Sequence, residues 1–305
     1  MRPADYDNEL RATAFAYLDG LRAKYGDAVP WRELREFTFE GDRISLVQPQ
    51  RGIRVVSGLP AALTILTKYS ERPEDRPYED IEGEDGYFRY KWRGTDPEGY
   101  DNVALRRAME LGRPLAWFVG VASGVYLPIY PLWLIDEEPS EHQFVMAFDQ
   151  IMRDGWSPAL LGHPEDAAVR KEYALRTVRQ RLHQRVFRER VLTAYQRRCA
   201  LCRLRHPELL DAAHIKEDSD GGPPIVPNGV AMCAIHHRAF DSDVIGIRPD
   251  YVLQVRPDVL IEVDGPTLRH ALQSLHGEAL WVPRKPAARP NQDLLDERYE
   301  RFLAS

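Results

Sequence analysis

The chain has 305 residues, enough for two domains, and an apolar fraction of 44% that is ordinary for a globular protein. No apolar run approaches the roughly 18 to 20 residues of a membrane-spanning helix, and the polar start MRPADYDNEL does not look like a signal peptide. We therefore expect a cytoplasmic protein with no membrane contact. The net charge of −6, taken alone, argues against a nucleic-acid partner.

The first 65 residues predict structural elements and carry no chemistry that we can identify. Apolar residues at helical spacing over residues 7–24 predict a helix that Gly26 ends. The alternating stretch 37–48 contains a Gly-Asp turn and predicts a hairpin. We expect this region to serve for packing.

The central segment predicts a mixed domain. Residues 73–84 are rich in Pro, Asp and Glu and predict a surface loop. Strands are predicted at 86–93, 114–121, 132–135 and 144–148, with one short helix over 101–111. Strands around one short helix indicate an α+β or small-barrel fold.

Aromatic residues are dense in this segment. They are Tyr87, Phe88, Tyr90, Trp92, Tyr100, Trp117, Phe118, Tyr126, Tyr130 and Trp133. With the order strand, loop, N-x-A-L helix, strand, residues 85–150 resemble the SRA/PUA-like modified-base readers. The resemblance implies base flipping, in which a base leaves the duplex and lies between aromatic rings. The alternative is that these rings are the core of a β-rich domain.

If a base pocket exists, its candidate residues are Tyr90, Trp92 and Asp96. They stand where a predicted strand enters a glycine-containing loop, and functional residues collect at such positions. Residues 151–165, with Pro, Gly and acids, predict a linker.

A long basic helix is predicted next, over residues 167–195, because the stretch lacks Pro and Gly. Residues 170–205 hold twelve Lys and Arg against two Glu, a local charge of +10 that leaves −16 for the remainder. Such a block suits a grip on the phosphate backbone of DNA, although alone it could be a solvated helix face. The residues that we expect to contact the DNA backbone are Arg181, Arg185, Arg188, Arg197 and Arg198.

All three cysteines lie in one stretch that predicts a zinc site. Cys199 and Cys202 form a C-x-x-C pair, and Cys233 and His236 form a C-x-x-H pair, with 30 residues between the two pairs. Two such pairs on tight turns supply the tetrahedral ligand set of a structural Zn²⁺ ion. An alternative is that the neighbouring His237 binds the zinc in place of His236.

A second set of residues is interleaved with the zinc ligands. His214 lies in LLDAAHI, Asn228 in PNGVAMC, and His237 and Asp241 in HHRAFD. A His, an Asn and a His inside a zinc knuckle resemble the HNH nuclease motif of the ββα-metal fold, over roughly residues 185–250. The alternative is a zinc-dependent DNA-binding module in which the histidines are not catalytic.

The resemblance implies hydrolysis of a DNA phosphodiester. His214 would be the general base, and Asn228 would hold it in place through the nearby backbone. His237 and Asp241 would bind a catalytic Mg²⁺ or Mn²⁺ ion. Many HNH proteins have an Asp or His directly before the general base, where this chain has Ala213. Asp211 is therefore a second candidate for the carboxylate, although in a β-hairpin it would face opposite His214.

These inferences together predict an α+β protein. An N-terminal β-rich SRA/PUA-like domain (1–150) is joined by a linker (151–165) and a basic helix to a C-terminal ββα-metal HNH domain with a structural zinc (166–305). We expect a modification-dependent restriction endonuclease acting on double-stranded DNA with a modified base such as 5-methylcytosine. A double-strand cut needs two active sites, so a homodimer is expected. The alternative is an HNH nuclease whose N-terminal domain binds a protein partner or oligomerises.

Overall fold

The structure, a computed structural model, describes residues 4–48, 50–70, 85–148 and 164–305. The chain forms two compact units, unit 1 (Met1–Leu182) and unit 2 (His183–Ser305), which meet within helix α4 (Pro164–Ala194). The predicted loop 73–84 lies outside the described residues, as does all but the end of the predicted linker 151–165. In the described part of the chain, no helix has the length and apolarity needed to cross a bilayer.

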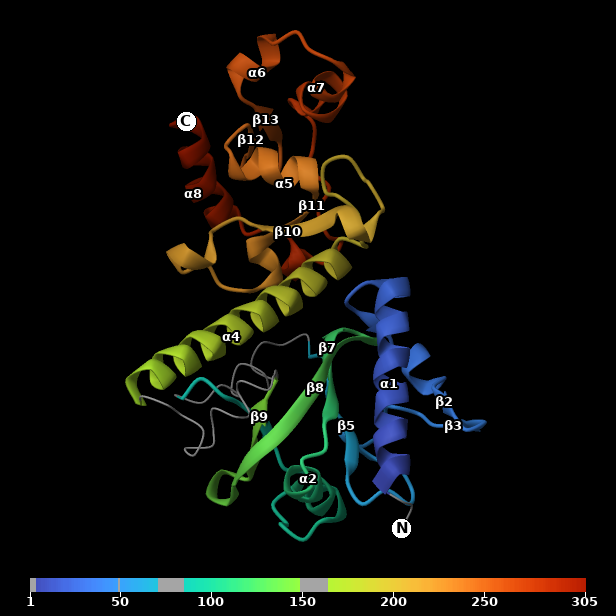
Figure 1. Cartoon of the computed structure of the whole chain (residues 1–305). Coiled ribbons are helices and arrows are strands. Elements are labelled where there is room, and N and C mark those ends of the chain that lie inside the picture. Colours follow the sequence, from blue (N-terminus) through green and yellow to red (C-terminus); the bar gives the residue numbers. More distant parts are fainter. Residues whose placement is uncertain (1–3, 49, 71–84, 149–163) are drawn as a thin grey trace. The chain divides into compact units, whose positions relative to one another are not determined.

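Unit 1 is built on a seven-stranded sheet (Figure 1). The strands follow the order β4-β5-β7-β8-β9-β6, and β1 pairs with β8. Their bounds are β1 Val29–Pro30, β4 Ile53–Val55, β5 Ala62–Thr67, β6 Phe88–Lys91, β7 Leu115–Ala122, β8 Val125–Glu138 and β9 Gln143–Ala147. The strands β5 and β7 run parallel, and the chain between them contains α2 (Tyr100–Glu110), which is the short helix predicted over 101–111.

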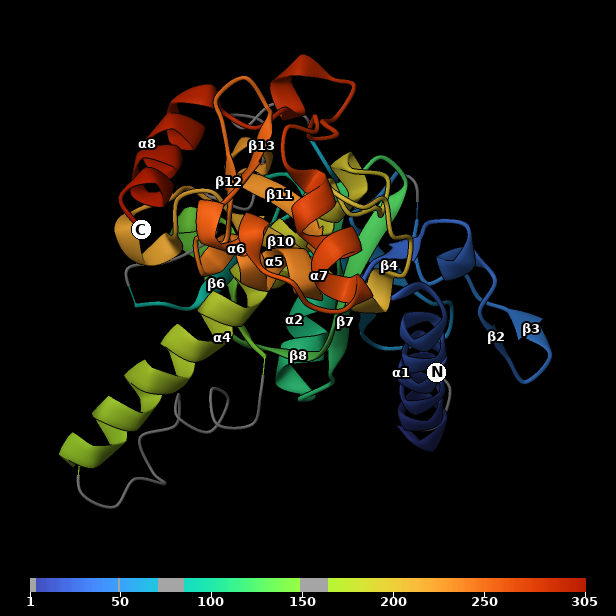
Figure 2. The ribbon, with the colours of Figure 1, turned by 90° about the horizontal axis from the view of Figure 1, so that it is seen from above.

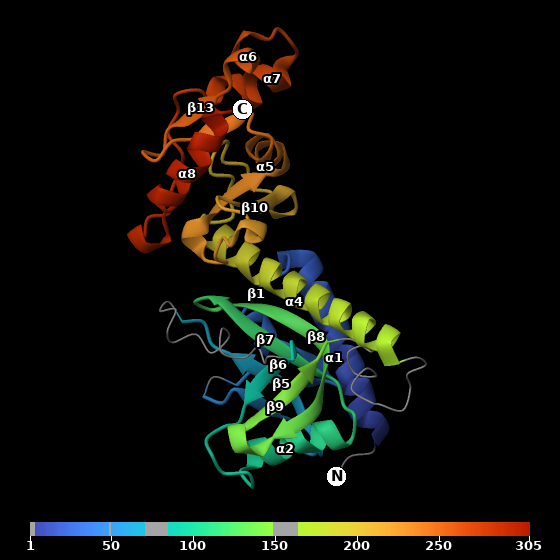
Figure 3. The same ribbon diagram turned by 90° about the vertical axis from the view of Figure 1, so that its left-hand side faces the viewer.

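The long strand β8 links two parts of this curled sheet (Figure 3). Its first half pairs antiparallel with β7, where Ile129 lies opposite Trp117. Its second half pairs with β9, where Trp133 lies opposite Ala147. The four predicted strands of the central segment are thus present, with 132–135 forming the middle of one longer strand.

The helix predicted over 7–24 is α1 (Ala4–Tyr25), which buries Leu10, Ala14 and Leu18 in the core of unit 1. It ends at Gly26, whose φ of 82° is in the left-handed region that a residue without Cβ adopts readily. The predicted hairpin is formed by β2 (Thr38–Phe39) and β3 (Asp42–Arg43).

The aromatic residues of the central segment lie mostly inside unit 1. Six of the ten are buried, namely Tyr87, Phe88, Tyr90, Trp92, Trp117 and Phe118. The ring of Trp117 stacks on Phe148 with centroids 6.0 Å apart, and its Nε1 donates to Thr67 Oγ1 at 2.9 Å. Buried rings of this kind form the core of a β-rich domain.

Unit 2 contains the end of α4, the hairpin of β10 (Leu210–His214) and β11 (Gly229–Cys233), and helix α5 (Ala234–Asp241). This order of two strands and a helix is the ββα arrangement that the sequence predicts. The remaining elements, several of them visible in Figure 2, are β12 Ile245–Ile247, β13 Leu253–Val255, α6 Pro257–Ile261, α7 Pro266–Ala271 and α8 Gln292–Leu303.

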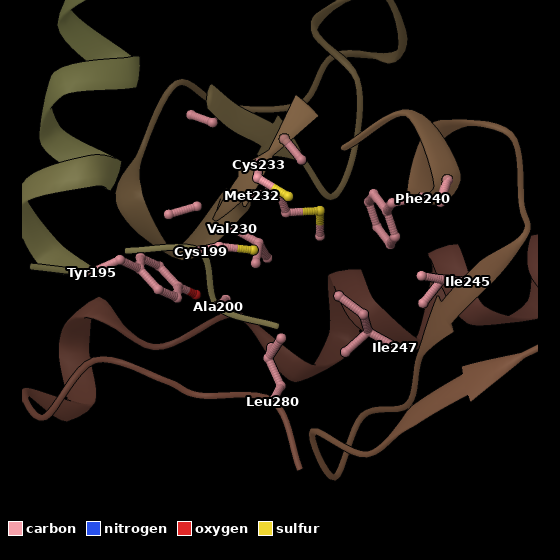
Figure 4. Close-up of a cluster of buried hydrophobic side chains, with 14 of the residues drawn as sticks. Tyr195, Cys199, Ala200, Val230, Met232, Cys233, Phe240, Ile245, Ile247 and Leu280 are labelled. Carbon is pink, nitrogen blue, oxygen red and sulfur yellow. The ribbon is translucent and has the colours of Figure 1, made fainter. Parts of the chain in front are cut away.

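One apolar cluster joins the elements of unit 2 (Figure 4). It combines Tyr195 from the chain after α4, Phe240 from α5 and Ile247 from β12. Cys199 and Cys233 lie among these apolar side chains. The elements that follow α5 therefore belong to the same core as the ββα motif.

Candidate active site

Four side chains in unit 2 form a group with the spacing of a metal site. They are Cys199, Cys202, Cys233 and His236, and their ligand atoms all lie within 4.8 Å of one another. The Sγ atoms of Cys202 and Cys233 are 3.9 Å apart, and His236 Nδ1 lies 3.3 Å from Cys199 Sγ. Tetrahedral zinc with Zn–S bonds of about 2.3 Å holds its sulfur ligands about 3.8 Å apart, so this donor set fits zinc.

The imidazole of His236 is fixed from its other side. Its Nε2 lies 2.7 Å from the carbonyl oxygen of Ala271, at the end of α7. Donation of the Nε2–H to this carbonyl leaves Nδ1 unprotonated and directed at the cysteines, the usual support for a zinc-bound histidine. The structure thus places His236 with the cysteines, whereas His237 faces the carboxylates described below.

The β10–β11 hairpin holds His214 at the end where the loop 215–228 joins its two strands. His214 is the last residue of β10 and lies opposite Gly229 in β11. Its ring stacks on Phe187 from α4, with centroids 4.1 Å apart and an interplanar angle of 13°. A Cβ at Gly229 would come within 2.8 Å of Phe187 Cζ and 2.5 Å of Val191 Cγ2, so glycine permits this close approach of α4.

The stacked position of His214 affects its charge. Burial lowers the pKa of His214, and the charge of His237 lowers it further, against an opposing contribution from Asp218. The imidazole is therefore neutral at neutral pH, which is the form that accepts a proton.

The fully buried side chain of Asn228 forms hydrogen bonds with the backbone of the loop that follows His214. Its Oδ1 accepts from Lys216 N at 2.9 Å, and its Nδ2 donates to the carbonyl oxygens of Lys216 at 2.9 Å and Pro223 at 3.0 Å. Its own carbonyl accepts from Ile215 N at 2.9 Å. The amide thus fixes the backbone directly after His214, which is the contact predicted for it.

His237, on α5, lies between two carboxylates. Its Nε2 is 3.4 Å from Asp241 Oδ2, and its Nδ1 is 3.5 Å from Asp211 Oδ2. Hydrogen bonding to Asp211 raises the pKa of His237, and Asp241 adds to this effect. We expected Asp211 to face opposite His214, and its carboxylate lies nearly as close to His237 as that of Asp241.

These three residues line an open groove of about 500 Å³. The complete lining is Arg188, Glu208, Leu209, Leu210, Asp211, Ala234, His237, Arg238 and Asp241. His214 is not part of this lining. Its pKa is lowered by the charge of His237, which does line the groove. Among the described residues, only the cysteine-histidine group has three or more metal-ligating atoms already clustered.

Two of the arginines expected to contact DNA form hydrogen bonds and ion pairs within the protein. The buried Glu189 accepts from Arg188 and from Arg197, each at 2.7 Å. Arg188 also donates to the carbonyl oxygens of Pro207 at 3.1 Å and Leu210 at 2.6 Å, and its Nε lies 3.4 Å from Asp211. Arg188 therefore fixes the start of β10.

The other three arginines of that prediction differ in exposure. Arg181 is exposed on α4, and Arg185 and Arg198 are half-buried. Their predicted role in binding DNA remains a prediction.

The residues predicted to form a base pocket differ in solvent exposure. Tyr90 and Trp92 are only 7% and 8% exposed, and the Tyr90 hydroxyl lies 3.1 Å from Gly52 O and 3.2 Å from Leu66 O. Asp96 is exposed and caps a turn by accepting from Glu98 N. The rings of Tyr90 and Trp92 are thus covered by protein, and stacking on a base would require their faces to be opened.

Helix α8 contributes residues that sequence reasoning missed. Arg298 is 6% exposed, donates to Phe240 O at 2.6 Å at the end of α5 and lies 3.4 Å from Asp243. Arg301 lies 3.5 Å from Glu217, in the loop after His214. No local pattern in the sequence indicates these contacts, which join residues 58 and 84 positions apart.

Comparison with known proteins identifies the stretch that carries this geometry. Residues 199–248 match the family model described as HNH endonuclease, so unit 2 contains an HNH endonuclease domain. A search of curated proteins gave no match.

Two solved restriction endonucleases are similar to the chain at low identity. One, titled "Modification dependent TagI restriction endonuclease", is 19% identical with a TM-score of 0.29, covering 83% of this chain and 86% of that one. Another, titled "Structure of the Type IV phosphorothioation-dependent restriction endonuclease ScoMcrA", is 13% identical with a TM-score of 0.22, covering 84% of this chain and 60% of that one.

Proposed function

We propose that the chain hydrolyses phosphodiester bonds of double-stranded DNA through a one-metal HNH mechanism, and that unit 1 restricts cutting to DNA with a modified base such as 5-methylcytosine. The observation that carries the cleavage part is the half-buried His214, with a lowered pKa, on the same ββα motif as His237 and its two carboxylates. That motif lies in the HNH endonuclease domain.

His214 acts as the general base. Its neutral imidazole takes a proton from the attacking water, whose oxygen bonds to phosphorus while the bond from phosphorus to the 3′ oxygen breaks. Phe187 holds the ring from one face, and Asn228 fixes the backbone of the following loop. Both are positioning residues in this scheme.

His237 and Asp241 provide mixed nitrogen and oxygen donors, which suit Mg²⁺ or Mn²⁺. When bound, such an ion polarises the phosphate and neutralises the charge on the leaving oxygen. We prefer Asp241 to Asp211 as the ligand. Asp211 already accepts a hydrogen bond from Ala212 N and lies beside Arg188. At Asp241, burial raises the pKa of the carboxyl group more than the charge of His237 lowers it, so a cation there would stabilise the charged form.

The reading of a modified base by unit 1 is supported by one unsatisfied group. The Nε1–H of Trp92 is buried and has no hydrogen-bond partner among the described residues. Buried donors are rarely left unpaired, and an indole N–H beside aromatic rings could serve the edge of a flipped base. Phe at position 92 would keep the ring and remove the donor, so Trp92→Phe should lower any preference for modified DNA and leave cleavage chemistry intact.

The direct test is cleavage of matched duplexes that carry cytosine, 5-methylcytosine or 5-hydroxymethylcytosine, with added Mg²⁺ or Mn²⁺. We expect cutting of a modified duplex and little cutting of the plain one. Equal cutting of all three would retain the nuclease and reject the base reader. No cutting of any duplex by zinc-loaded protein would reject cleavage of these substrates and favour the binding-module alternative.

A second role for unit 1 is favoured by the burial of its aromatic residues. Since six of the ten rings lie in the core, unit 1 could instead bind a protein partner or a second copy of the chain. Light scattering of the full chain, with and without modified DNA, separates the two. A dimer that forms without DNA, together with equal affinity for plain and modified duplexes, would support this second role.

A further inference from the structure

A cluster of arginines lies on the zinc knuckle, outside helix α4. It consists of Arg198, Arg203 and Arg205, which flank the ligands Cys199 and Cys202. Arg203 and Arg205 are exposed and Arg198 is half-buried. By contrast, Arg188 and Arg197 form ion pairs with the buried Glu189, so part of the positive charge of residues 170–205 is already neutralised.

Backbone hydrogen bonds of the knuckle bring the three residues close together in the fold. Cys199 N donates to Leu204 O at 3.0 Å and closes a tight turn. Arg198 and Arg205 stand directly outside this bonded pair, so they lie across from each other.

Arg203 is held in an unusual backbone conformation. Its φ is 68°, in the left-handed region that glycine occupies more easily, and its N–H donates to Cys199 O at 3.0 Å. Its guanidinium lies 4.4 Å from the centroid of the Trp281 ring. Stacking on an indole orients the plane of the group and leaves its N–H edge available for an anion.

Carboxylates do not neutralise this cluster. In the described part of the chain, none of the three guanidinium groups has a carboxylate oxygen within 4.0 Å. The nearest acid in sequence, Glu208, pairs with His206 at 3.2 Å. A concentrated positive charge of this kind is the feature that binds the phosphates of nucleic acid.

We propose that Arg198, Arg203 and Arg205 form a binding surface for DNA phosphates on the zinc knuckle. The inference rests on the DNA-cleaving function proposed above and assigns the backbone grip to the knuckle. Arg205 is three residues before Glu208, which lines the groove with His237. Three residues span at most about 11 Å, so a duplex bound at the groove would have phosphates within reach of the cluster.

The test is the salt dependence of DNA binding by the full chain. Fluorescence anisotropy with a labelled duplex, without added Mg²⁺ or Mn²⁺ so that the DNA stays intact, gives the slope of log Kobs against log salt. The slope is negative, and each lost phosphate contact reduces its magnitude by about 0.9. We expect Arg198→Gln, Arg203→Gln and Arg205→Gln together to reduce this magnitude by about 2 to 3, and Arg205→Gln alone by about 0.9.

The control removes the same charge elsewhere in unit 2. Arg248→Gln, Arg256→Gln and Arg269→Gln together also delete three cations, and two of these are paired with Asp250 and Asp258. This variant should keep the wild-type slope. Zinc content of every variant is measured, because Arg198 and Arg203 adjoin zinc ligands, and Arg205→Gln decides the matter if the triple variant loses its metal.

The outcomes separate this inference from the proposed function. A wild-type slope in Arg205→Gln and in a zinc-loaded triple variant would overturn the knuckle surface while leaving the nuclease intact. A lowered slope in a protein that binds DNA but never cuts it would support the surface and reject the cleavage function. Absence of DNA binding by the wild-type chain would overturn both.

Discussion

The two units use aromatic side chains in different ways. In unit 1, Trp117 stacks on Phe148 and donates to Thr67, so its ring and its polar atom are both satisfied inside the core. In unit 2, Phe187 stacks on a half-buried histidine at the loop end of a hairpin. The difference teaches that aromatic density alone does not mark a site. A ring that supports a titratable group beside a groove is the more specific sign of function.

The largest effect is expected from the zinc ligands. Cys233 ends β11 and lies in the core of unit 2, so Cys233→Ser should release zinc and unfold much of that unit, because structural zinc supplies folding free energy directly. Hydrogen exchange should show loss of protection in β10 and β11 and retained protection in β7 and β8. Intact protection in the hairpin of zinc-free protein would contradict a structural role for the metal.

The next largest effect concerns the core of unit 1. Trp117→Ala should lower the free energy of unfolding by about 3 to 5 kcal/mol, because it removes a ring that is 1% exposed and leaves a cavity. Denaturant titration followed by fluorescence measures this. Below the unfolding transition, cleavage of a modified duplex should be unchanged. Normal stability with lost discrimination would instead make Trp117 a base-reading residue and break the comparison drawn above.

The roles of the two carboxylates beside His237 can be distinguished by how much the loss of each raises the Mg²⁺ concentration that cleavage requires. Asp241→Asn should raise the Mg²⁺ concentration needed for half-maximal cleavage by at least about 10- to 100-fold, the range that loss of a group supporting a metal ligand already produces. Asp211→Asn should raise it less, because Asp211 is already compensated by Ala212 N and Arg188. Metal titration of both variants gives the order, and the reverse order would make Asp211 the ligand.

A smaller effect is expected from replacing Phe187, whose ring stacks on His214. Burial holds the pKa of His214 below its ordinary 6.5, and the deprotonated form is the active base, so cleavage should fall as pH drops through that lowered value. Phe187→Leu exposes the ring to water and should move the acid limb upward toward 6.5 at saturating Mg²⁺. The variant then loses more activity at about pH 6 than at about pH 8. An unmoved or lowered acid limb would contradict this.

The local chemistry of unit 2 could be predicted from sequence because it depends on short spacings. The two ligand pairs and the hairpin bring Cys233 opposite Leu210 and His214 opposite Gly229, and each step is set by turns and strand pairing. The register of the hairpin then leaves Asn228 next to the residue opposite His214. These placements follow from covalent connection and the two-residue period of strands.

The contacts that join distant segments could not be predicted. The stacking of Phe187 on His214, the capture of Arg188 and Arg197 by Glu189, and the contact of Arg298 with Phe240 O depend on packing that no local pattern encodes. The same holds in unit 1. The alternation around Tyr90 and Trp92 predicts a strand, but it does not tell which face of that strand is buried. Their interior position is decided by the rest of the sheet.

The central claim, that His214 is the general base, is tested most directly by His214→Ala. Single-turnover cleavage of a modified duplex at saturating Mg²⁺ should fall by about 10²- to 10⁴-fold, while zinc content and DNA affinity stay at wild-type values. His270→Ala, an exposed histidine on α7 of the same unit, is the matched control and should cut normally. Undiminished cleavage by zinc-loaded His214→Ala protein would contradict the account.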